Sequence, residues 1–310
     1  MQRARAKYGL VIWAGVAAVG VLAVCASAAP PPLDAVAKVS IGAQSGMVLS
    51  AGGSIWTTDL ALGRVVRIDP ATNTVVKKIT LRSRPFAIAY GSGSLWVADR
   101  SLNTLARINP GNGKVLKRIR IGYGTYGATF AAGSLWLTSE SDGRLRRVNP
   151  KTNRVTKTIK AGTGPNGVVY AFGALWVADL AGGKLLKIDV HKNTVTKRYA
   201  VPKADWITPS PDALWVSSED GSVYRFDPGA GKVVAKVAVG ANPLGSAWIN
   251  GELWVPNIDD STLSIVDPAK NAVRTTLATG ESPLSIASAA GDVWISVSDD
   301  GEVWRVKPVQ

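Results

Sequence analysis

Short runs of alternating apolar and polar residues fill most of the chain, and turns rich in Gly, Asn, Asp and Pro separate them. Residues 85–124 show the pattern once. The run 85–90 alternates, a Gly-Ser-Gly turn follows, and further runs lie at 95–99, 105–108 and 114–121. A period of two is typical of half-buried β-strands. Four such strands joined by tight turns predict an antiparallel four-stranded unit.

This unit recurs seven times. A tryptophan marks the second strand of each copy, with spacings of 40, 40, 40, 39, 39 and 40 residues: Trp56, Trp96, Trp136, Trp176, Trp215, Trp254 and Trp294. An Asx-Pro or related turn follows most third strands in the same phase, as in Asp69-Pro70 and Asn149-Pro150. A period of about 40 residues with four strands is typical of a propeller blade. The predicted fold class is therefore all-β, a seven-bladed β-propeller with four-stranded blades.

The last copy is incomplete. After Trp294 the sequence supplies a third strand at 302–306 and then ends at Gln310. The missing fourth strand matches residues 36–41, whose sequence resembles that of 234–239. We therefore expect the N-terminal strand to complete the last blade and close the ring, which leaves only short sheet edges.

The first 28 residues form a segment of their own. Arg3, Arg5 and Lys7 precede an apolar run at 9–24, and Ala26-Ser27-Ala28 is a small-x-small cleavage pattern. This order predicts a signal peptide, with an uncleaved membrane anchor and a lipoprotein as alternatives. The domains are then 1–28, signal peptide or membrane anchor, and 29–310, the propeller. The expected location is secreted, periplasmic or in the cell envelope, with the N-terminal segment as the one membrane contact.

Cysteine usage and charge narrow the chemistry. Cys25 is the only cysteine and lies in the N-terminal segment, which excludes disulfides and thiolate chemistry from the propeller. His191 is the only histidine and falls in an outer turn, so it is a poor catalytic candidate. Asp59, Asp99 and Asp179 end second strands, where we expect them to cap turns. Mg²⁺ or Ca²⁺ would suit such carboxylates, but no ligand motif assigns either cofactor.

The loop leading into each first strand repeats least, and in a propeller it rims the channel. Aligned on the tryptophans, the residues at this position are Gly46, Phe86, Tyr126, Asn166, Asp205, Leu244 and Leu284. A mixed aromatic and polar rim is typical of a small-ligand or peptide site. The candidate ligand-binding residues are Phe86, Tyr126, Asn166, Asp205 and Trp206. The alternative is that these side chains only plug the channel.

Charge is divided unevenly along the chain. The whole chain carries a net charge of +14; residues 30–160 hold 20 Lys and Arg against 6 Asp and Glu, and residues 161–310 hold 13 against 16. A basic sector of this kind attracts polyanions. The candidate polyanion-binding residues are Arg118, Arg120, Arg146 and Arg147. Nothing resembles a base-reading element, so sequence-specific nucleic-acid recognition is not expected.

The strand motif Gly-x-Leu-Trp-Val-Ala-Asp, the Asx-Pro turns and the Gly-x-x-Pro lead-in at 162–165, 240–243 and 280–283 resemble the virginiamycin B lyase-like and YVTN-type bacterial propellers. The resemblance covers about residues 33–308 and implies a seven-bladed propeller. Streptogramin lyases of that family open a macrocyclic ester with a histidine base and a magnesium ion. No histidine here matches that role, so the resemblance does not carry the activity over.

These features favour a non-catalytic binding propeller outside the cytoplasm. Its expected partner is a small ligand, a peptide or an anionic cell-wall polymer. The alternative is a carbon–oxygen lyase of the virginiamycin B lyase type, or a lactonase-type hydrolase, that uses carboxylates and a divalent cation.

Overall fold

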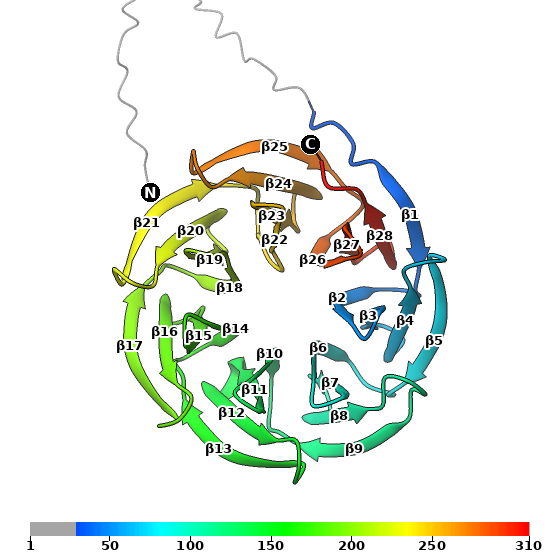
Figure 1. Ribbon diagram of the computed structural model, residues 1–310, viewed down its shortest axis with the longest axis vertical. Coiled ribbons are helices and arrows are strands. Elements are labelled where there is room, and N and C mark those ends of the chain that lie inside the picture. Colours follow the sequence, from blue (N-terminus) through cyan, green and yellow to red (C-terminus); the bar gives the residue numbers. More distant parts are fainter. Residues whose placement is uncertain (1–28, 310) are drawn as a thin grey trace, which may run out of the picture.

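The computed structural model describes residues 29–309 as seven four-stranded antiparallel sheets arranged in a ring (Figure 1). This confirms the predicted seven-bladed β-propeller. The one helical element among these residues is the 3-10 turn η1 (Glu140–Asp142). No helix between residues 29 and 309 has the length and apolar character needed to cross a membrane. The predicted signal peptide or anchor lies outside the described residues.

Each blade runs from an inner strand beside the ring axis to an outer strand at the circumference. Blade 1 is β2 (Ser45–Ala51), β3 (Ser54–Asp59), β4 (Arg64–Asp69) and β5 (Thr74–Thr80). Blade 2 is β6 (Pro85–Gly91), β7 (Ser94–Asp99), β8 (Thr104–Ile108) and β9 (Val115–Arg120). Blade 3 is β10 (Thr125–Ala131), β11 (Ser134–Ser139), β12 (Arg144–Asn149) and β13 (Arg154–Lys160). Blade 4 is β14 (Pro165–Ala171), β15 (Ala174–Asp179), β16 (Lys184–Asp189) and β17 (Thr194–Ala200).

The remaining blades follow the same order, except that the last takes its outer strand from the start of the chain. Blade 5 is β18 (Ala204–Pro209), β19 (Leu214–Ser218), β20 (Ser222–Asp227) and β21 (Lys232–Ala238). Blade 6 is β22 (Ala247–Ile249), β23 (Glu252–Asn257), β24 (Thr262–Asp267) and β25 (Ala272–Ala278). Blade 7 is β26 (Pro283–Ala289), β27 (Asp292–Val297), β28 (Glu302–Val306) and β1 (Ala35–Ser40).

The second strand of each blade forms the core. All six residues of β7 are buried, because the neighbouring blades cover both of its faces. The seven repeated tryptophans are at most 1% exposed. In blade 2 the indole N–H of Trp96 donates to the Gly91 carbonyl at 3.0 Å, which satisfies its one polar atom. The repeated tryptophans are therefore structural rather than a ligand-stacking ring.

An arginine on the third strand joins each of five blades to the next, an arrangement we call the arginine latch. In blade 2 the Arg107 guanidinium lies 4.9 Å from the Trp96 ring centre. It donates to the Ser94 hydroxyl at 2.9 Å, the Pro150 carbonyl at 2.6 Å and the Asn153 side chain at 2.9 Å, the last two in blade 3. Asn153 adopts a φ of 55°, which asparagine tolerates well. The latch arginines are Arg67, Arg107, Arg147, Arg225 and Arg305.

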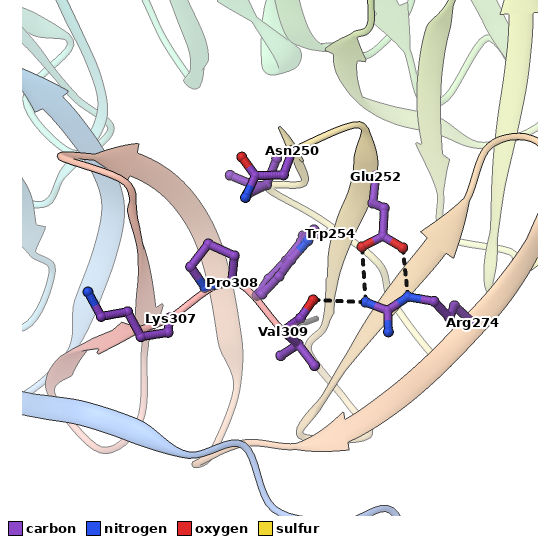
Figure 2. Close-up of a pocket in the computed structure, with 8 residues that line it drawn as sticks. Asn250, Glu252, Trp254, Arg274, Lys307, Pro308 and Val309 are labelled. Atoms are coloured by element: carbon purple, nitrogen blue, oxygen red, sulfur yellow. Dashed lines mark hydrogen bonds and ion pairs between the residues drawn. The ribbon is translucent and has the colours of Figure 1, made fainter.

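The junction between blades 6 and 7 is built differently. Ile265, not a cation, lies opposite Trp254, and no turn joins the third and fourth strands of blade 7, because β1 supplies the fourth strand. Arg274 of β25 makes the contacts at this junction instead. Its guanidinium donates two hydrogen bonds to the Glu252 carboxylate, at 2.6 and 3.0 Å, and one to the Val309 carbonyl at 3.1 Å (Figure 2). A cavity of about 700 Å³ remains beside these residues.

The residues at both ends of the propeller fasten this junction. β1 pairs antiparallel with β28, as the sequence predicted, so that Val39 lies opposite Val303. Just before β1, the Leu33 N–H donates to the Ala278 carbonyl of blade 6 at 2.8 Å. Blades 6 and 7 are thus joined by main-chain bonds where the arginine latch is missing.

Replacing a latch arginine should weaken the ring measurably. Arg107→Ala removes three hydrogen bonds from a charged donor, and bonds of this kind each contribute about 1.5–3 kcal/mol. We expect a loss of roughly 2–4 kcal/mol in the free energy of unfolding, measured by urea denaturation. Arg154→Ala, on the exposed outer strand of the next blade, is the matched control and should cost less than about 0.5 kcal/mol. Equal losses in the two variants would contradict the latch.

Deleting residues 33–41 should open the ring. The deletion removes β1 together with the buried side chains of Leu33, Val39 and Ile41, which are 6%, 5% and 0% exposed. At about 1.5–3 kcal/mol for each buried apolar side chain, the loss approaches the whole stability of a typical domain. The bared edge of β28 should also promote association. Size-exclusion chromatography with light scattering and thermal melting would test this; a monomer that melts like the parent contradicts ring closure by β1.

Candidate functional site

A β-bulge at the start of the first strand shapes the channel. In blade 2 the pairing with β7 shifts between Pro85 and Ile88, and equivalent shifts occur in blades 1, 3, 4, 5 and 7. The bulge contains the position that the repeat alignment singled out. Phe86 of blade 2 belongs to one cluster with Leu284 of blade 7 and with Leu244, the residue at the same repeat position in blade 6, so these residues meet near the ring axis. Bulges commonly re-aim side chains in this way.

Two glycines within the bulges let the inner strands approach one another. A Cβ on Gly127 would lie 2.4 Å from the Asn166 carbonyl oxygen, and one on Gly167 would lie 2.6 Å from the Asp205 carbonyl oxygen. Real Cβ atoms do not come so close to backbone atoms. Glycine at these two positions therefore brings the bulges of blades 3, 4 and 5 into contact.

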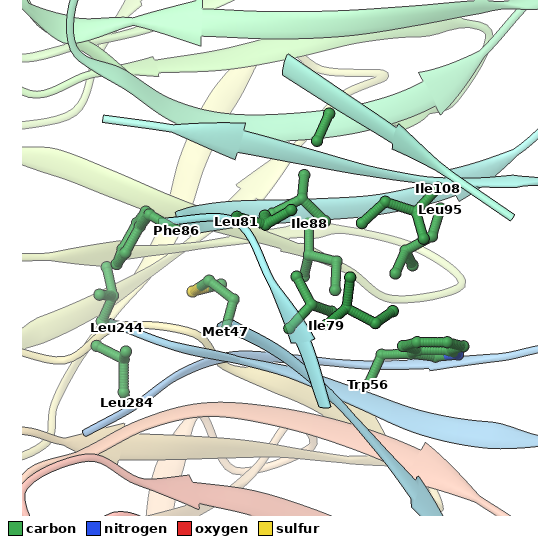
Figure 3. Close-up of a cluster of buried hydrophobic side chains, with 13 residues drawn as sticks. Met47, Trp56, Ile79, Leu81, Phe86, Ile88, Leu95, Ile108, Leu244 and Leu284 are labelled. Carbon is green, nitrogen blue, oxygen red and sulfur yellow. The ribbon is translucent and has the colours of Figure 1, made fainter. Parts of the chain in front are cut away.

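The apolar bulge residues fill one side of the channel. The rings of Phe86 and Tyr126 are 5.0 Å apart, and Trp206, Leu244 and Leu284 pack in the same cluster. Figure 3 shows Phe86, Leu244 and Leu284 gathered beside one another. Phe86 is 6% exposed, so this part of the predicted rim acts as a plug. Phe86 is thus less accessible at the channel than the alignment suggested.

Asn166 and Asp205 form the polar side of the channel. The Asn166 amide nitrogen donates to an Asp205 carboxylate oxygen at 2.9 Å, and the two residues are 1% and 3% exposed. Burial raises the pKa of Asp205 to about 7, with the charges of Glu219 and Glu140 adding to the effect, while the Asn166 hydrogen bond and Arg100 oppose it. Burial also raises the pKa of the nearby Tyr126 phenol, which remains protonated at neutral pH.

A second ring of residues lies beside the lead-in loops, on the face of the propeller where these loops enter the first strands. In every blade, the residue that follows the second strand donates its N–H to a carbonyl of the lead-in loop, as Arg100 does to Arg84 at 3.1 Å. The members of this ring are Leu60, Arg100, Glu140, Leu180, Glu219, Ile258 and Ser298. Arg100 lies 5.3 Å from the Phe86 ring centre and 5.2 Å from that of Tyr126, and it contacts Glu140 at 3.3 Å. Stacking therefore holds one guanidinium over the aromatic plug.

A cavity of about 380 Å³ opens beside Arg100. Its lining comprises Leu60, Arg84, Phe86, Arg100 and Ser101. Arg84 is exposed, and its guanidinium makes no hydrogen bond or ion pair with any residue between 29 and 309. Of the sequence-predicted residues only Phe86 reaches this cavity. Arg84 and Arg100 were missed because the blades were compared at the residue after Pro85 and at the last residue of the second strand, whereas Arg84 precedes Pro85 and Arg100 follows Asp99.

Acidic residues gather on the same face of the propeller, across the channel from the cavity beside Arg100. A cavity of about 410 Å³ is lined by Glu219, Asp220, Gly221, Ala241, Asn242 and Asp259. Asp220 is already engaged, by the Tyr224 hydroxyl at 2.6 Å and the Lys236 ammonium at 2.9 Å. Across residues 29–309, no three His, Cys, Asp or Glu side chains are grouped so as to hold a metal ion.

The aspartates that end second strands cap turns, as expected. Asp99 accepts the N–H groups of Ser101 and Leu102 at 2.7 and 3.0 Å. Burial acts to raise the pKa of Asp99, but the Ser83 side chain, the Leu102 N–H and the Ser101 side chain and N–H together lower it. Asp59 accepts from Leu62, and Asp179 accepts from Gly182. These carboxylates stabilise the loops that follow the second strands, at the mouth of the channel.

The four predicted polyanion-binding arginines lie in different settings. Arg120 is exposed on β9, and Arg118 on the same strand donates to the Leu81 carbonyl at 3.3 Å. Arg146 pairs with Asp142. Arg147 is a latch arginine, held by Ser134, the Val190 carbonyl and Asn193. The first two therefore present charge at the surface, whereas the last is committed to the junction of blades.

Comparison with known proteins shows the fold. No family model matches this chain, and no curated protein matches its sequence. The chain is similar to a streptogramin B lyase structure, with 15% identity, a TM-score of 0.76, and coverage of 87% of this chain and 96% of that one. It is also similar to Kuenenia stuttgartiensis hydrazine synthase, with 12% identity, a TM-score of 0.77, and coverage of 92% and 99%. The likeness to the lyase supports the propeller type that the sequence resembles, and at these identities it shows the fold alone.

The buried Asp205 should make stability depend on pH. Its folded-state pKa of about 7 exceeds its ordinary value of 3.8, so the folded protein binds the proton more tightly than the unfolded chain. Stability contributed by this group is therefore complete below pH 4 and is lost as the pH rises through 7.

Asp205→Asn keeps the shape and removes the titration. Relative to the parent, the variant should gain about 2–3 kcal/mol more at pH 8 than at pH 5, as an upper estimate from roughly 1.4 kcal/mol per pH unit. Urea unfolding of both proteins at the two pH values measures this difference directly. A difference that does not change with pH would show that Asp205 is ionised in the folded protein at both values.

Proposed function

We propose that this propeller is a non-catalytic binding protein outside the cytoplasm, and that it holds a small carboxylate-bearing ligand or peptide end at the channel mouth. The cavity beside Phe86 carries this proposal. Arg84 and Arg100 contribute two basic side chains to its lining, and Leu60 and Phe86 contribute apolar surface. Paired guanidinium and apolar groups suit a ligand with an anionic end and an apolar body.

The stacking of Arg100 supports a binding role. Its guanidinium is held against two rings at 5.2–5.3 Å, so little side-chain freedom remains to be lost when a ligand binds. Arg84 has its charge unpaired at the cavity, which leaves it available to an incoming carboxylate. The basic and apolar N-terminal segment and the cysteine-free propeller support the location outside the cytoplasm.

A competing function, a lyase or lactonase-type reaction, is favoured by one observation. A carboxyl with a pKa of about 7, such as that of Asp205, can exchange protons at neutral pH. Against this, Asp205 is only 3% exposed and accepts a hydrogen bond from Asn166, so a substrate does not reach its carboxyl group without rearrangement. The binding role therefore has the stronger geometric support.

Calorimetry with a matched pair of probes tests the proposal. N-acetyl-alanyl-phenylalanine presents a carboxylate and an apolar body, and its C-terminal amide lacks only the charge. The acid should bind at least about 10-fold more tightly than the amide, since a hydrogen bond to a charged group is worth about 1.5–3 kcal/mol. Arg84→Gln should remove this preference, whereas Arg82→Gln, exposed in the same loop but outside the cavity, should retain it.

Two results would overturn the binding proposal. One is equal affinity for the acid and the amide in the parent protein. The other is turnover: incubation with a cyclic ester peptide and Mg²⁺, followed by mass spectrometry, would reveal ring opening. Ring opening that Asp205→Asn abolishes would establish the lyase or lactonase function instead.

A further inference from the structure

The outer strands of blades 1 to 4 carry a continuous belt of positive charge. These strands, β5, β9, β13 and β17, follow one another around the circumference (Figure 1). They contain no acidic residue. Their basic residues, all exposed, are Lys77, Lys78, Lys117, Arg118, Arg120, Arg154, Lys157, Lys160, Lys197 and Arg198. We call this set the basic belt.

The belt differs from the rest of the circumference in its pairing. No residue of the basic belt forms an ion pair with a described residue. On the outer strands of blades 5 to 7, by contrast, Lys236 pairs with Asp220 and Arg274 pairs with Glu252, and Lys232 forms no ion pair with a described residue. Lys38 lies 3.8 Å from the Trp304 ring centre. Cations at sheet edges prevent edge-to-edge pairing, and blades 5 to 7 do this with far fewer. Edge protection therefore does not account for ten unpaired charges.

We propose that the basic belt binds a flexible phosphodiester polymer of the poly(glycerol phosphate) kind. Unpaired Lys and Arg side chains attract phosphate and release its counterions on binding. Because the belt curves around a ring, a flat bilayer can contact only a small part of it at once, whereas a flexible chain can follow it across four blades.

The basic belt provides little aromatic surface on which a nucleic-acid base could stack. Single-stranded nucleic acids bind largely by stacking on exposed aromatic rings. The one aromatic residue on these four strands is Tyr199, whose ring packs 4.8 Å from Phe226 and 6.1 Å from Trp176. A polymer that presents phosphates without bases therefore fits the belt better.

The binding should depend steeply on salt. If about six belt residues contact phosphates, the logarithm of affinity should fall with the logarithm of salt concentration with a slope near −4, by analogy with single strands. Raising the salt from 50 to 200 mM should then weaken binding by about 300-fold. Fluorescence anisotropy with labelled poly(glycerol phosphate) measures both quantities on the propeller.

Two fourfold variants separate the belt from net charge. Lys117→Gln, Arg120→Gln, Arg154→Gln and Lys157→Gln remove belt charges that make no ion pair. Lys232→Gln, Lys236→Gln, Lys270→Gln and Lys307→Gln remove the same charge from blades 5 to 7. The belt variant should lose about 30-fold or more in affinity at 100 mM salt and flatten the slope by up to about 3. The control should lose less than about 3-fold, and thermal melting should show both variants folded.

Several outcomes would overturn the proposal. Equal losses in the two variants would reduce the effect to net charge, and absence of salt-sensitive binding would leave the belt as solvated surface. A thymidine oligonucleotide of equal phosphate number that binds more tightly than poly(glycerol phosphate) would make the partner a nucleic acid. Tighter binding to phosphatidylglycerol vesicles would make it a membrane surface.

Discussion

The burial of one tryptophan per blade is the constraint on which the ring depends. A four-stranded sheet cannot cover both faces of its own second strand, so each blade needs a neighbour on either side. The latch arginine on the third strand connects neighbouring blades, because its guanidinium stacks on the tryptophan of its own blade and donates to the turn of the next blade, as Arg107 does. In the five blades that have a latch arginine, the same residue contacts the buried tryptophan and the next blade. A ring is the arrangement in which every blade meets this requirement.

The junction between blades 6 and 7 follows from the same constraint. A latch from blade 6 would need a turn between the third and fourth strands of blade 7, and the chain has no such turn because that blade's fourth strand comes from β1. Ile265 at the latch position is consistent with this, since an arginine there would have no turn to bond. The bonds of Leu33 to Ala278 and of Arg274 to Val309 instead hold the residues before β1 and after β28 to blade 6. The segment that closes the ring, β1 with the residues before it, therefore also joins blade 7 to blade 6.

The sequence was sufficient for the fold because its signals are local and repeated. The tryptophan period, the turns and the match between residues 36–41 and 234–239 each recur in phase, and the pairing of β1 with β28 confirmed the closure. The latch could not be predicted this way, because Arg147 and its acceptor at Val190 are 43 residues apart and belong to different copies. At the mouth, the alignment identified the bulge positions. It could not show that Phe86 would be covered while Arg84 stayed open, since that depends on how neighbouring blades pack.

The mouth differs chemically from the scaffold because different positions build it. Latch and tryptophan positions make contacts that recur from blade to blade, whereas the bulge position is left out of the regular strand pairing and the residue after the second strand is held through its backbone, by the N–H bond to the lead-in loop. Their side chains can therefore vary from blade to blade without disturbing the ring. Here Arg100 lies on one side, with Arg84 of the lead-in loop, carboxylates such as Glu219 lie on the other, and Asp205 is buried at a bulge beside Asn166. For the same reason, a propeller at 12–15% identity can share this ring and hold a different site.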